Sequence, residues 1–134
     1  MTLLDARPPK PRNPNLKYLV LFLVLALITG GLFAYRFWNY PEERAVARFL
    51  ATLEQGDYQK AYQLWQPSPS HRFGDFLRDW GEQGDYGKIR EFAILVSKSK
   101  GTRTVIVTVR INKVDPPLDL LVDRKTKGMA YSVF

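Results

Sequence analysis

The sequence predicts an α+β protein, in which one N-terminal transmembrane helix precedes three helices packed on a curved four-stranded antiparallel sheet. Three observations predict this class. An uncharged apolar run occupies residues 18–35. Apolar residues then recur at intervals of three and four up to Trp80, and from Lys88 onward they alternate with polar residues. We therefore divide the 134 residues into a disordered basic tail at 1–17, a transmembrane helix at 18–36 and a folded domain at 42–134.

The apolar run has the length and the flanks of a membrane helix. At about 1.5 Å per residue it spans roughly 27 Å, close to the thickness of a bilayer core. Tyr18 marks one edge, and aromatic residues crowd the other, as in an interfacial belt: Tyr35, Phe37, Trp38 and Tyr40. A cleaved signal peptide is the alternative. The bulky residues at 32–38, LFAYRFW, lack the small residues of a cleavage site, which favours a retained signal-anchor.

The charges around this run predict its orientation. Four basic residues lie ahead of it: Arg7, Lys10, Arg12 and Lys17. Behind it, Arg36 and Arg44 are accompanied by the acidic residues Glu42 and Glu43, so the positive bias is weaker. The positive-inside rule then places the N-terminus in the cytoplasm and the domain outside the inner (plasma) membrane, which is periplasmic in a bacterium. The expected partners are the lipid bilayer and either a membrane protein or a second copy of the chain.

One face of the membrane helix carries small residues. Ala26, Gly30 and Ala34 are spaced four apart, a pattern that lets two helices approach closely. The sequence therefore offers a possible helix–helix face. Glycine is also common in membrane helices that do not pair.

The soluble part begins with three amphipathic helices. Pro41 followed by two acids suits a first turn, and Gly56 suits a left-handed end. Asp57 is predicted to cap a second helix, which ends before Pro67. Apolar residues at 73, 76, 77 and 80 predict the third helix.

Four strands are expected after the helices. In the first, Phe92, Ile94 and Val96 alternate with the residues between them, and in the second Val105, Val107, Val109 and Ile111 face one way. A third strand contains the alternating apolar residues of 118–122, and a last strand is expected at 129–134. Short connections make these strands an antiparallel meander, and the helices are the available cover for one face.

Residues 45–65 read AVARFLATLEQGDYQKAYQLW: a helix, a Gly-Asp-Tyr turn, and then Ala-Tyr before a large apolar residue. With the order of elements that follows, this resembles the nuclear transport factor 2-like superfamily, the cystatin-like α+β roll, over residues 42–134. The resemblance implies a cone between helices and sheet. Some members of the superfamily place acid/base residues there, and many others are non-catalytic.

The residue types argue against most chemistry. There is no cysteine and a single histidine, His71, so no metal or cofactor site and no catalytic residue is predicted. Sixteen basic and twelve acidic residues are interspersed from residue 36 onward, unlike a nucleic-acid surface. The resemblance would place any acid/base residues among Asp57, Tyr58, Tyr62, Asp75, Asp79, Tyr86 and Tyr131. Asp57 is better explained as a cap, and Asp75 and Asp79 are expected to be solvated.

Aromatic residues are the remaining candidates for a site. Five of them on or near the second and third helices are either core or the wall of a pocket or partner surface: Tyr58, Tyr62, Trp65, Phe73 and Trp80. The sequence thus favours a membrane-tethered, non-catalytic binding or assembly module. Two alternatives stay open, an accessory subunit that acts mainly through its membrane helix and an acid/base enzyme with a pocket in the cone.

Overall fold

The structure, a computed structural model, describes residues 8–132, and the chain divides into two compact units, Met1–Phe37 and Trp38–Phe134. In the first unit, α1 spans Asn15–Phe37 and contains the predicted membrane helix. Its 23 residues extend over about 34 Å, and none of them is buried. By length and composition α1 can cross a membrane. Residues 8–13 contain no helix or strand, and the first seven residues of the expected tail lie outside the described part of the chain.

The second unit opens with α2, Tyr40–Glu54, which is the main helix of the domain. Pro41 lies in its first turn together with Glu42 and Glu43, as expected. One stripe of the helix is buried: Val46, Phe49, Leu50 and Leu53. Gly56 then takes a φ of 78°, the left-handed conformation predicted for the helix end.

Two shorter helices complete the helical layer. Asp57 caps α3, Tyr58–Trp65, by accepting a hydrogen bond from the backbone N–H of Lys60 over 3.1 Å. After a loop, α4 spans Phe73–Trp80, the helix that the apolar spacing predicted. Its first-turn acid, Asp75, accepts from the backbone N–H of Arg72 over 3.1 Å and so satisfies one of the free donors at the helix start.

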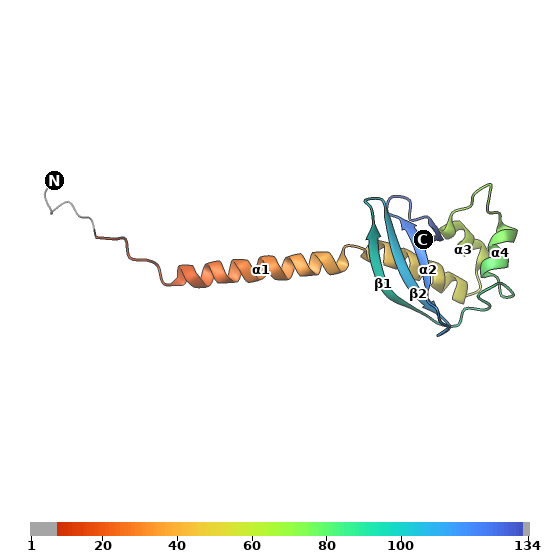
Figure 1. Cartoon of the computed structure of the whole chain (residues 1–134), viewed down its shortest axis with the longest axis horizontal. Coiled ribbons are helices and arrows are strands. Elements are labelled where there is room, and N and C mark those ends of the chain that lie inside the picture. The colour runs from red at the N-terminus through yellow and green to blue at the C-terminus, as the bar shows by residue number, and fades with distance from the viewer. Residues whose placement is uncertain (1–7, 133–134) are drawn as a thin grey trace. The chain divides into compact units, whose positions relative to one another are not determined.

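The sheet has the predicted meander order, β1-β2-β3-β4, with every neighbouring pair antiparallel (Figure 1). The strands are β1, Phe92–Lys100; β2, Thr104–Ile111; β3, Leu118–Asp123; and β4, Met129–Tyr131. The predicted last strand is shorter than expected, and its final residues, 133–134, lie outside the described part. The α+β class and the helix-then-sheet order are therefore confirmed.

A β-bulge corrects one expectation for β1. Ile94 pairs with Val109 and Val96 with Thr108, so Leu95 is an extra residue in the strand. The bulge turns Val96 to the outer face, where it is 45% exposed, so the expectation that Val96 continues the alternation of Phe92 and Ile94 is wrong. Ser97 takes the core-side position instead, opposite Val107.

The core lies between α2 and the sheet, and α3 and α4 close one end of it. Phe49 of α2 is at its centre, with its ring 5.3 Å from Trp65 and 5.1 Å from Trp80. On the sheet side, β2, β3 and β4 contribute Val105, Val107, Val109, Leu120, Val122 and Met129. These side chains occupy the space that the resemblance assigns to an open cone.

Candidate functional site

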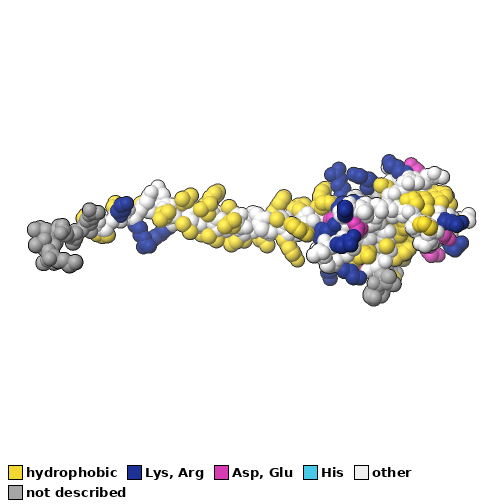
Figure 2. Space-filling model, turned by 90° about the horizontal axis from the view of Figure 1, so that it is seen from above, with side chains coloured by type: hydrophobic (Ala, Val, Ile, Leu, Met, Phe, Trp, Pro, Cys, Tyr) yellow, Lys and Arg dark blue, Asp and Glu magenta, His cyan; other side chains and the backbone are white. Residues whose placement is uncertain are grey.

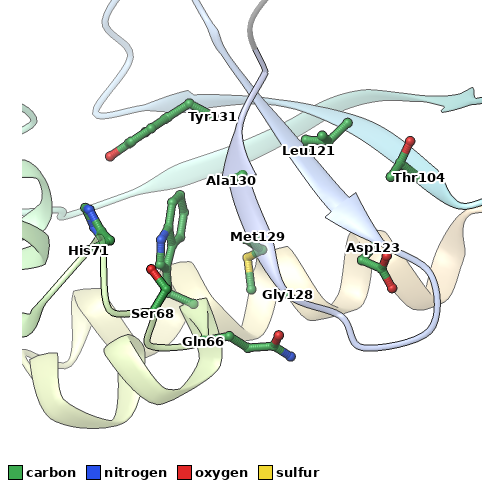
Figure 3. Close-up of a pocket in the computed structure, with 11 residues that line it drawn as sticks. Gln66, Ser68, His71, Thr104, Leu121, Asp123, Gly128, Met129, Ala130 and Tyr131 are labelled. Atoms are coloured by element: carbon green, nitrogen blue, oxygen red, sulfur yellow. The ribbon is translucent and has the colours of Figure 1, made fainter.

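A groove of about 500 Å³ runs along β4, the last strand of the sheet. Its walls come from the end of α3 and the loop after it, and from strands β2 to β4: Trp65, Gln66, Ser68, His71, Thr104, Leu121, Asp123, Gly128, Met129, Ala130 and Tyr131. Figure 3 shows His71 and Tyr131 on one side of the β4 ribbon and Thr104 and Leu121 on the other. The groove therefore follows an edge of the sheet and does not enter the core.

The backbone of β4 presents alternate groups to this groove. Ser132 donates its N–H to the carbonyl of Asp119 over 3.1 Å, and Gly128 accepts from the N–H of Asp123 over 3.0 Å. Because the backbone groups of a strand alternate in direction, Gly128 and Ser132 face β3, whereas Met129 and Tyr131 direct their N–H and C=O groups away from it. Such an outer edge can pair with an extended peptide.

The loop that forms the far wall is held in place. Tyr62 donates its hydroxyl hydrogen to the carbonyl of His71 over 2.8 Å. Ser68 and His71 form an isolated antiparallel bridge, with the N–H of His71 donating to the carbonyl of Ser68 over 3.1 Å. Gln66 donates from its side-chain amide to the carbonyl of Thr126 over 2.6 Å and so links the loop to the β3–β4 turn.

Three polar groups gather where the groove meets α4. The Nε2 atom of His71 lies 3.8 Å from Oδ2 of Asp79, and both side chains are about one-quarter exposed. Asp79 is thus less solvated than the sequence suggested. Burial raises the pKa of Tyr131 well above its ordinary value, and the negative charge of Asp79 adds to this effect.

These groups are close together, but they are not hydrogen-bonded to one another with normal geometry. Among the described residues, the buried Nε2 of His71 and the hydroxyl of Tyr131 have no hydrogen-bond partner. Within residues 8–132, this trio brings together a histidine, a carboxylate and a phenol, which are residue types that general acid/base catalysis uses. No local spacing in the sequence indicates it, because the loop, α4 and β4 each supply one member.

The five aromatic residues singled out from the sequence occupy two kinds of position. Trp65 and Trp80 are buried, with 6% and 1% of their surface exposed, and of the five only Trp65 lines the groove. Tyr58, Tyr62 and Phe73 are partly buried and pack against the core. Burial, with the negative charge of Glu82, raises the pKa of Tyr58.

Among the described residues, no contact accounts for the small size of the side chains at positions 26, 30 and 34 of α1. Ala26 and Ala34 are exposed, and a Cβ added at Gly30 would have no atom within 4 Å. Within residues 8–132 there is also no group of three His, Asp or Glu side chains that could hold a metal ion.

Comparisons of the chain with protein-family models, with curated proteins and with solved structures found no match.

Proposed function

We propose that this chain is a single-pass membrane protein whose C-terminal domain is a non-catalytic binding or assembly module outside the cytoplasm. The observation that carries the proposal is the combination of α1 with the groove along β4. The first is an apolar helix of 23 residues, and the second is a surface suited to an extended peptide.

The anchoring and its direction rest on α1 and its flanks. Basic residues precede the helix within a short segment, and bulky residues stand where a signal peptidase would need small ones. On this proposal α1 stays in the inner (plasma) membrane with the N-terminus in the cytoplasm. The order of three helices and four strands supports membership of the nuclear transport factor 2-like superfamily, which we propose as the family of the domain.

The groove favours a protein partner over a small substrate. Its most regular recognition elements are the backbone groups of Met129 and Tyr131, which pair with any extended segment. Core side chains pack between α2 and the sheet, and the groove lies at the edge of the sheet. Only Trp38 and Asn39 separate α1 from α2, so a partner that binds the domain must also reach the membrane surface. We therefore infer that the occupant is an extended segment of a membrane-bound protein.

Site-specific photo-crosslinking tests this function. A photoreactive amino acid is placed at Ala130, which is exposed and lines the groove, in the full chain expressed in its native membranes. We expect a discrete protein adduct at Ala130 that is absent with the same group at Glu82, an exposed residue outside the groove. An adduct pattern that is the same at both positions would reject the groove as the binding site.

The trio His71, Asp79 and Tyr131 favours one second candidate, an acid/base enzyme. In that case His71→Gln and Asp79→Asn would each abolish cellular function while the thermal stability and the Ala130 adduct stay unchanged. The non-catalytic proposal expects function to survive both substitutions wherever the fold survives.

The third candidate, an accessory subunit that acts through its membrane helix, is favoured only by the face of Ala26, Gly30 and Ala34. It expects function to persist when the groove is blocked and to fail when α1 is replaced by an unrelated membrane helix.

A further inference from the structure

The two hairpin turns of the sheet lie side by side at one end of the domain. Lys100 pairs with Thr104, and Thr104 pairs with Asp123, so the β1–β2 turn and the β3–β4 turn are at the same end of the strands. The backbone N–H of Arg124 donates to the carbonyl of Arg103 over 2.8 Å, which joins the two turns directly.

This end of the domain is also where the chain enters it. The side-chain oxygen of Asn39 accepts hydrogen bonds from Nη2 of Arg124 over 2.8 Å and from the hydroxyl of Ser99 over 3.2 Å. Asn39 comes two residues after the last residue of α1, Phe37. The hairpin turns are therefore fixed beside the segment that connects the domain to the membrane helix.

Basic side chains dominate this end. Figure 2 shows Lys and Arg side chains gathered around it. We name as the basic end six exposed residues of the two turns, their strands and α2: Arg44, Arg48, Lys98, Lys100, Arg103 and Lys125. Within the described part of the chain, none of the six forms a salt bridge.

The acidic groups nearby are engaged within the domain. Glu42 is buried and lies 2.8 Å from Nζ of Lys127 and 3.6 Å from Nη1 of Arg124. Glu43 accepts a hydrogen bond from the hydroxyl of Ser97. Asp123 accepts from the backbone N–H groups of Thr126 and Lys125, which hold the pKa of its carboxyl below the usual range. Asp123 also interacts electrostatically with Arg103. The six exposed cations, together with Arg124 and Lys127, outnumber these three acids, so the basic end has a net positive formal charge.

A hollow of about 480 Å³ opens at the same end, beside the start of α2. Arg44 and Arg48 stand one turn apart on its rim, and Lys127 contributes a third cation to its lining. One guanidinium group can donate two parallel hydrogen bonds to the oxygens of a phosphate. A phospholipid headgroup presents such oxygens at the membrane surface. Tyr40 completes the wall with a ring of the kind found at membrane interfaces.

We propose that the basic end binds the anionic phospholipid headgroups of the bilayer that holds α1. The inference rests on the proposed membrane anchor and adds the surface by which the domain docks on the lipid. Two arguments carry it: the charge is complementary to anionic headgroups, and the connection through Trp38 and Asn39 keeps this end of the domain close to where α1 leaves the membrane. Docking would hold the domain in one orientation.

The full chain, reconstituted in lipid nanodiscs, provides the test. Because the chain has no cysteine, one can be introduced for a fluorophore at Thr102, in the exposed β1–β2 turn. A second preparation carries the fluorophore at Gln55, the exposed residue after the far end of α2. A quencher attached to lipid headgroups then reports which end lies on the bilayer, in discs of phosphatidylcholine alone or with phosphatidylglycerol.

We expect strong quenching at Thr102 in phosphatidylglycerol discs, little in phosphatidylcholine discs, and no dependence on lipid at Gln55. An ionic strength of about 1 M, where the Debye length is about 3 Å, should abolish the difference. In the triple variant Lys98→Gln, Lys100→Gln, Lys125→Gln, the ratio of docked to free domain should fall about 100-fold. The matched control removes the same charge from the other end of the domain: Lys60→Gln, Lys88→Gln, Arg90→Gln.

The possible results distinguish failure of lipid binding by the basic end from failure of the membrane anchor. Quenching at Thr102 that is equal in both lipids, or that is lost equally in both triple variants, overturns the lipid inference and leaves the anchor standing. In that case the basic end is free for an acidic protein segment. Failure of the chain to co-elute with the discs overturns the anchor and the inference together.

Discussion

The guanidinium of Arg124 donates a hydrogen bond to the side-chain oxygen of Asn39 over 2.8 Å, across 85 residues of sequence. The same guanidinium lies 3.6 Å from the buried carboxylate of Glu42 and donates to the hydroxyl of Ser99 over 2.8 Å. One side chain of the β3–β4 turn thereby holds together the start of α2, the end of β1 and the segment that follows α1.

Removing this side chain should destabilise the domain. In Arg124→Ala the buried Glu42 keeps, among the described residues, its ion pair with Lys127, and three polar contacts are lost. We therefore expect the free energy of unfolding to fall by about 1–3 kcal/mol. Near-UV circular dichroism of the full chain in detergent measures the melting temperature. Arg103→Ala, an exposed neighbour, should change stability by less than about 0.5 kcal/mol. Equal melting temperatures for both variants would mean that the Arg124 contacts contribute nothing.

The two buried tryptophans should behave as core residues. Trp65→Ala and Trp80→Ala each remove a ring packed on Phe49 and should cost roughly 3–5 kcal/mol. Trp38, which is 66% exposed, provides the control: Trp38→Ala should cost less than about 0.5 kcal/mol. A small cost at Trp65, together with loss of the Ala130 adduct, would instead make Trp65 part of the partner surface.

Tyr131 should make the domain sensitive to alkali. Burial raises the pKa of Tyr131, so folding favours the neutral phenol. The stability that this group contributes is present below the unfolded pKa of about 10 and is lost as the pH rises above it. Tyr131→Phe removes no hydrogen bond seen among the described residues, so its stability should match that of the parent at neutral pH and fall less above about pH 10.

Tyr62→Phe is the matched control for this substitution. Tyr62 donates to the carbonyl of His71 over 2.8 Å, so its loss should cost about 1 kcal/mol at neutral pH. If urea unfolding at several pH values gives Tyr131→Phe the same decline in alkali as the parent, another group is responsible for the sensitivity.

The small-residue face of α1 predicts an effect on association. If Ala26, Gly30 and Ala34 bring two copies together, Gly30→Leu should weaken the contact by steric exclusion. A membrane two-hybrid assay, with residues 10–40 as both bait and prey, measures the self-association of α1. Leu25→Ile, on another part of the helix, controls for insertion. An unchanged signal with Gly30→Leu, or no signal with the parent, removes this face from the account.

Much of the fold follows from local patterns, and the exceptions have physical reasons. Gly56 and Asp57 mark a helix end and a helix start by their own chemistry, so both were predictable. The bulge at Leu95 was not, because β-branched and apolar residues continue through it and the strand pattern reads the same with or without the extra residue. Val96 was therefore assigned to the wrong face.

The candidate site was less accessible to sequence reasoning. The groove depends on which strand ends the sheet, and the approach of His71 to Asp79 depends on how the loop before α4 folds back on that helix. The hydrogen bond from Tyr62 to the backbone of His71, which holds that loop, leaves no sequence pattern either. The residues of the basic end are interspersed with acidic residues along the sequence, and the register of the hairpins and the packing of α2 bring them to one end of the domain.

The central claim is that α1 anchors the domain on the non-cytoplasmic side of the membrane, and cysteine accessibility tests it most directly. Single cysteines at Asn13, before α1, and at Gln83, in the domain, are treated with a membrane-impermeant maleimide in intact spheroplasts. We expect Gln83→Cys to be labelled in intact spheroplasts and Asn13→Cys only after lysis. Both variants should remain in the membrane pellet after carbonate extraction. Labelling of Asn13→Cys alone in intact spheroplasts, or recovery of the domain in the carbonate supernatant, would contradict the account.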